Sequence, residues 1–65
     1  MNNKLLNQAV GHVVIELNAK GNTNFETICS VCSAVKVMMW YLYGDDIFDI
    51  QDLIDEVSIF YKQAA

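Results

Sequence analysis

The 65-residue sequence predicts a single all-α domain of three short helices, and two copies of this domain are expected to form a homodimeric helical bundle. Apolar side chains recur three or four positions apart along most of the chain, which is the pattern of amphipathic helices. Gly21 and Gly44 divide the chain into three segments, and the sequence has no proline. The hydrophobic share is 54%. One core of this size cannot bury all of it, so we expect a second copy to cover the remainder.

The first helix is expected over residues 4–19. Gly21 follows it as a stop signal, because glycine readily adopts the left-handed conformation that ends a helix. Six apolar residues of this segment recur at the spacing of one helical face; they are Leu6, Ala9, Val10, Val13, Val14 and Leu17.

The second helix is expected over residues 24–43. Thr23 and Glu26 have the spacing of a capping box, in which each side chain accepts a hydrogen bond from the other's backbone N–H. Apolar residues occupy nearly every side of this segment. A helix of that kind is either central to the fold or lies at a subunit interface.

The third helix is expected over residues 46–62. Asp45 or Asp46 can cap its first turn, where carboxylates also interact favourably with the helix dipole. Lys62, near the other end, is well placed for the negative end of that dipole. Between them, an apolar residue at almost every third or fourth position supplies a broad face for the core.

The formal net charge is −4, and the four lysines are scattered singly with no arginine. Proteins that bind nucleic acid usually present a basic patch or stripe, which this sequence lacks. The chain opens without a secretory signal, and its longest uninterrupted apolar run has seven residues, too few to span a bilayer. We therefore expect a cytoplasmic protein that contacts neither membrane nor nucleic acid.

Cys29 and Cys32 form a C-x-x-C, the one enzyme-like motif in the sequence. A redox role would need a βαβ context, and a zinc site would need two further ligands, whereas His12 is the only histidine. We interpret both cysteines as small core residues and His12 as structural. No catalytic residue, metal ligand, cofactor-binding residue or cofactor is predicted.

Carboxylates are concentrated between residues 45 and 56 with no basic residue among them. Apolar residues at helical spacing interrupt this stretch, so it is a helix face and not a calcium-binding loop. It is either a solvated surface or a docking surface for a basic partner. The candidate docking residues are Asp45, Asp49, Asp52, Asp55 and Glu56.

The most distinctive cluster consists of methionine and aromatic residues at the end of the second helix. Such residues dominate both small cores and adaptable protein interfaces, and both roles can hold if the core is shared between subunits. The residues predicted for the dimer or partner interface are Val37, Met38, Trp40, Tyr41 and Tyr43.

Several strings along the chain together suggest a family. They are Leu6-Asn7-Gln8-Ala9-Val10, the Gly21-Asn22 turn, the apolar pattern from Ile28, the Asp46 region and the pattern from Ile54 to Tyr61. With these, most of the chain resembles the YmgB/AriR family of small enterobacterial regulators, which includes YcgZ-type connector proteins. The resemblance implies a helical homodimer that acts in biofilm and acid-resistance regulation as a connector to two-component phosphorelays. DNA binding has also been proposed for that family. The family has no catalytic residues that the resemblance could assign to this chain.

We therefore expect a non-enzymatic regulatory protein that acts through protein–protein contact. Its expected partners are a second copy of itself and a regulatory protein, for which a basic protein is the candidate. Three alternatives come from other classes: a DNA-binding or nucleoid-associated repressor, a redox or metal switch built on Cys29 and Cys32, and an acidic decoy for nucleic-acid-binding proteins.

The DNA-binding alternative can be tested directly. Four separated lysines can displace few counterions from a duplex, so at physiological salt we expect no binding tighter than ~10⁻⁴–10⁻⁶ M. Fluorescence anisotropy of a labelled duplex over a salt series measures this. Nanomolar, sequence-selective binding in the presence of competitor DNA would favour the repressor.

Overall fold

The computed structural model describes residues 3–44 and 47–64. In these residues it contains helices α1 (Asn3–Lys20), α2 (Phe25–Tyr43) and α3 (Ile50–Ala64), and no strand. The predicted all-α fold is confirmed.

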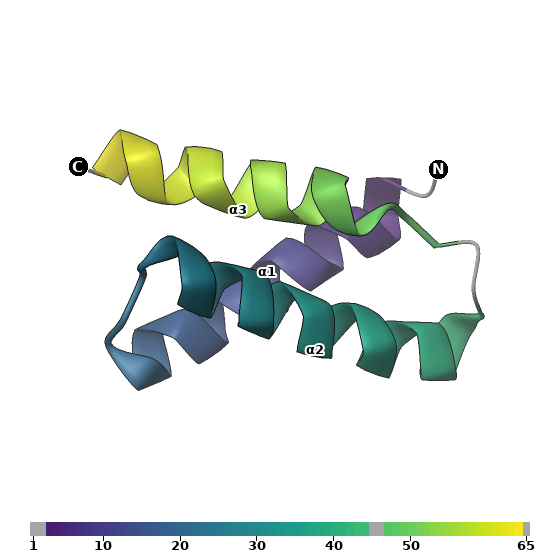
Figure 1. Ribbon diagram of the computed structural model, residues 1–65. Coiled ribbons are helices and arrows are strands. Elements are labelled where there is room, and N and C mark those ends of the chain that lie inside the picture. Colours follow the sequence, from purple (N-terminus) through teal and green to yellow (C-terminus); the bar gives the residue numbers. More distant parts are fainter. Residues whose placement is uncertain (1–2, 45–46, 65) are drawn as a thin grey trace.

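The helices form an up-down-up bundle with overall dimensions of 33 × 19 × 16 Å. α2 runs opposite to α1, and α3 returns along α2 in the direction of α1 (Figure 1). Each helix packs against the other two. The core between them is entirely hydrophobic, since the described residues include no buried polar or charged residue. One polar contact joins the first and last helices, where the Tyr61 hydroxyl donates to Asn18 Oδ1 at 3.3 Å.

The buried face of α1 is a row of side chains spaced three or four residues apart, as predicted. Leu6, Ala9, Val13 and Leu17 all lie in the core. The helix ends as the sequence indicated: Gly21 has a φ of 71°, and its N–H donates to the carbonyl of Leu17 at 2.9 Å. This left-handed residue satisfies a carbonyl that the helix would otherwise leave unpaired.

The N-terminus of α2 is capped by Asn24, so the predicted capping box of Thr23 and Glu26 is wrong. Asn24 has extended backbone angles, and its Oδ1 accepts from the Thr27 N–H at 2.8 Å. The backbone N–H of Asn24 donates in turn to Asn22 Oδ1 at 3.0 Å. Asparagine is as good an N-cap as threonine, and this pair of asparagines moves the helix start one residue later than the capping box would.

One side of α2 packs into the core, and the helix then stops at Gly44. The N–H of Gly44 donates to the carbonyl of Trp40 at 2.8 Å. The core side of α2 consists of Ile28, Val31, Cys32, Val35 and Met39.

The third helix begins at Ile50, four residues later than predicted. Ile47 and Phe48 precede it and are both buried. Consecutive helical residues point about 100° apart, so the non-helical link allows both side chains to enter the core. Asp45 and Asp46, the predicted caps, lie outside the described residues, as does the side chain of Lys62.

Burial in α3 predicts a large difference between two apolar residues of that helix. Leu53→Ala removes a fully buried side chain and should lower the free energy of unfolding by about 2–5 kcal/mol. Ile59→Ala, at a half-exposed position, is the matched control and should cost less than about 1 kcal/mol. Urea denaturation at one fixed protein concentration measures both, and equal losses would contradict the packing.

Candidate interaction surface

The methionine and aromatic cluster of α2 is divided between the core and the surface. Met39 is 1% exposed, whereas Val37 is 62% and Tyr41 is 85% exposed. Met38 and Leu42 are also exposed. The last two turns of α2 thus place one side chain inside the bundle and leave most of the others in water.

The exposed residues lie on two sides of the helix. Ser30, Ala34, Val37 and Tyr41 are spaced 4-3-4, so they form one seam on the exposed side of α2, with Met38 beside it. We call these five residues the outer face of α2. Trp40 and Tyr43 were predicted in the same interface as Tyr41. They lie roughly 100° and 160° around the helix from it and are therefore not on this face.

The outer face carries no charge. The charged residues of α2 are Glu26, which lies on the same side one turn before Ser30, and Lys36, which lies on another side of the helix. The described carboxylates of the predicted docking face lie on α3 and just before it, as expected; they are Asp49, Asp52, Asp55 and Glu56. The net charge of −4 is therefore unevenly distributed: acidic side chains are concentrated around α3, whereas the outer face of α2 is apolar.

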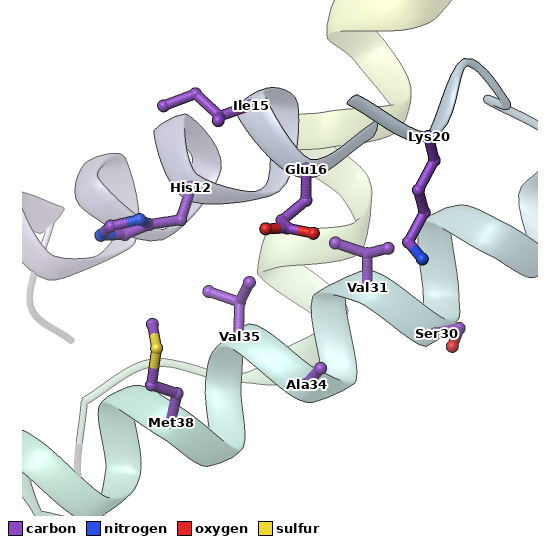
Figure 2. Close-up of a pocket in the computed structure, with 9 residues that line it drawn as sticks. All are labelled: His12, Ile15, Glu16, Lys20, Ser30, Val31, Ala34, Val35 and Met38. Carbon is purple, nitrogen blue, oxygen red and sulfur yellow. The ribbon is translucent and has the colours of Figure 1, made fainter. Parts of the chain in front are cut away.

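A groove of about 430 Å³ lies between α1 and α2 on the surface next to the outer face. Figure 2 shows Glu16 and Lys20 extending from α1 toward α2, and Val35 and Met38 extending from α2 toward α1. The sequence analysis did not predict this groove. His12, Glu16 and Lys20 are spaced four residues apart, which already indicates that they lie along one side of α1. The residues that line it are His12, Ile15, Glu16, Lys20, Ser30, Val31, Ala34, Val35 and Met38.

The two cysteines are free and differ in their surroundings. Cys32 is buried, and Cys29 is partly buried one turn earlier in α2. Burial, with a smaller contribution from Cys29, raises the pKa of the Cys32 thiol from 9.0 to about 11. A thiolate is the form that attacks electrophiles and binds metals, so Cys32 is held in its unreactive form at neutral pH. Within the described part of the chain, no group of three or more histidine, cysteine or acidic side chains could hold a metal ion.

The carboxylates around α3 do not all face solvent. Asp49, Asp55 and Glu56 are exposed, and Gln51 Nε2 donates to Asp55 Oδ1 at 2.9 Å. Asp52 is partly buried, and its Oδ2 has no hydrogen-bond partner among the described residues. Asp52 lies in the first turn of α3, where the helix dipole favours a carboxylate. Asp45 of the predicted docking face lies outside the described residues.

α2 is long and apolar enough to meet the length and composition criteria for a membrane span. The sequence prediction did not anticipate this, because it counted only uninterrupted apolar residues. The core helix of a soluble protein meets the same criteria, and one side of α2 does pack against α1 and α3.

No protein-family model, curated protein or solved structure matches this chain. The interaction surface is therefore argued from the geometry of the chain itself, and the resemblance to the YmgB/AriR family stays a prediction.

The burial of the cysteines predicts two thiols of unequal reactivity. In native protein at pH 8, an alkylating reagent should modify Cys32 far more slowly than Cys29, and both should react rapidly in denaturant. Because the folded pKa of Cys32 lies above its unfolded value, Cys32 should also reduce stability as the pH rises from 9 to about 11. Mass spectrometry of timed samples measures the modification, with Cys32→Ala as control. Rapid native modification of Cys32 would instead favour a thiol-based switch.

Proposed function

We propose that this protein is a non-enzymatic regulatory module that acts through protein–protein contact and associates with a second copy through the outer face of α2. The observation that carries the proposal is the row of exposed apolar side chains on one side of the C-terminal half of that helix, where that side bears no charged residue. Uncharged, apolar surfaces with aromatic and methionine side chains are typical of interface centres.

The energetics of a small chain support self-association. A domain of about 60 residues buries only about 60% of its unfolded surface, so its core alone gives marginal stability. Val37, Met38 and Tyr41 hold apolar surface in water that a second subunit could cover. Burying such a side chain fully contributes about 1.5–3 kcal/mol, which is a large share of the stability of a small domain.

The surroundings of Cys32 support a structural role for that residue. The raised pKa of Cys32 keeps its thiol protonated, and its side chain fills space between the helices. His12, which the sequence analysis interpreted as structural, is instead exposed outside the core and lines the α1–α2 groove. The proposal therefore assigns no catalytic residue, no metal and no cofactor.

The resemblance to the YmgB/AriR family supplies a biological setting for the proposal. A connector of two-component signalling must bind at least one regulatory protein besides itself. The acidic residues Asp49, Asp55 and Glu56 offer a separate surface for a basic partner, on α3 and just before it and not on the helix proposed for self-association. Biofilm and acid-resistance regulation are the processes in which such a connector would act.

The proposal predicts a homodimer in which folding and association are linked. The melting temperature should rise with protein concentration, because a second subunit binds only the folded chain. Tyr41→Asp places a charge on the outer face and should weaken association at least tenfold. It should retain the helical signal, because Tyr41 is 85% exposed in the single chain.

Sedimentation equilibrium and circular dichroism measure these two properties. Ile59→Asp is the matched control, since it places the same charge on a half-exposed apolar residue of α3. A compact wild-type monomer at tens of micromolar, with a melt independent of concentration, would contradict the proposal.

A further inference from the structure

The outer face of α2 changes in side-chain size from one end to the other. Ser30 and Ala34 at its N-terminal end are small, whereas Val37, Met38 and Tyr41 at its C-terminal end are large. All five residues are exposed, so neither end is filled by the chain's own helices. The surface is therefore self-complementary in shape if one copy is reversed relative to the other.

We propose that two copies pair through antiparallel α2 helices, with the large end of each outer face packed on the small end of the other. This inference rests on the self-association proposed above and specifies its geometry. The two-fold axis passes between positions 34 and 37, so Tyr41 of one copy lies opposite Ser30 of the other. Ala34 then lies opposite Val37.

Packing explains why the antiparallel arrangement is preferred to the parallel one. In a parallel pair, Tyr41 would meet its own copy and Ser30 would meet its own copy, which crowds one end and leaves a void at the other. Interfaces are packed as densely as protein interiors, so both faults cost stability. The 4-3-4 spacing of the seam also suits two helices that cross at about 20°. Antiparallel helix dipoles add a favourable electrostatic contribution.

The α1–α2 groove gives the partner's large side chains a place to enter. Ala34 and Met38 belong both to the outer face and to the lining of the groove, so the two surfaces are continuous (Figure 2). A tyrosine at an interface needs a polar partner for its hydroxyl group, and Glu16 and Lys20 on α1 supply such groups beside the apolar floor. In a two-fold pair the groove of each subunit receives side chains of the other subunit, so both grooves are filled.

The charge distribution indicates that the occupant is a second copy and not a basic partner. Two chains of net charge −4 repel each other, and the repulsion is smallest where the contact surface itself is uncharged. None of the five residues of the outer face is acidic, basic or histidine, and the groove beside it carries one acidic and one basic side chain of opposite charge, Glu16 and Lys20. A basic protein would gain little there and more from the carboxylates of α3.

Photo-cross-linking of the full chain tests the direction of pairing. Tyr41→p-benzoylphenylalanine keeps an aromatic ring at the large end, and irradiation links it to whatever it touches in the other copy. Trypsin cuts after Lys20 and Lys36, so the two ends of the outer face fall on different peptides. In dimers isolated from a denaturing gel, the antiparallel pair predicts links to peptide 21–36, which carries Ser30 and Ala34, or to peptide 5–20, which carries the α1 side of the groove. Links to peptide 37–62 would show a parallel pair and overturn the inference.

A steric variant tests which face is used. Ala34→Trp fills the small end of the outer face and should weaken dimerisation at least tenfold by sedimentation. Ala19→Trp is the matched control, because Ala19 is also an exposed helical alanine but lies on α1 and does not line the groove. Circular dichroism should show that both variants are folded.

The outcomes separate this inference from the proposed function. If the wild-type chain dimerises and its cross-links join to peptide 37–62, only the antiparallel geometry is overturned. If Ala34→Trp dimerises as well as the wild-type chain, the pairing uses another face, and the assignment of the outer face in the proposed function is overturned as well. If the wild-type chain stays monomeric at tens of micromolar, the proposed self-association and this inference are both wrong.

Discussion

The whole structure depends on the packing of α1 and α3 against one side of α2. Met39, Val35 and Ile28 on that side belong to one hydrophobic cluster with Leu17 of α1 and Leu53 of α3. Two short helices can cover only part of the circumference of a third, and α2 is apolar over more than the part they cover. The exposed outer face follows from this geometry. It is the portion of an apolar helix that a chain of 65 residues has no further helix to cover.

Much of the fold could be predicted from the sequence, because helical periodicity and glycine stops are local signals. The row from Leu6 to Leu17 and the left-handed Gly21 follow from spacing and backbone freedom alone. The cap of α2 could not be chosen with certainty, since Thr23 and Asn24 are adjacent and both are good N-caps. The late start of α3 depends on Ile47 and Phe48 entering the core, which is a tertiary effect without a local signal.

The candidate surface was only partly predictable for a related reason. The sequence pointed to the cluster at the end of α2, and helical spacing alone could have separated Tyr41 from Trp40. Which side of an apolar helix remains exposed is decided by where the other helices pack, and this requires the fold. The burial of Met39 beside the exposed Met38 illustrates the point, since the two residues are chemically identical neighbours.

The segment that joins α2 to α3 is part of the hydrophobic core, because Ile47 and Phe48 are buried within it. The link between α1 and α2 is different, since residues 21–24 are all exposed and contribute no core side chain. The two connections should therefore tolerate change unequally. An inserted peptide or a protease cut at the first link would leave the core intact, whereas the same change next to Ile47 would displace two of its side chains. The short polar turn before Phe25 is therefore the position at which this fold should best tolerate an inserted epitope or a reconnection of the helices in a new order.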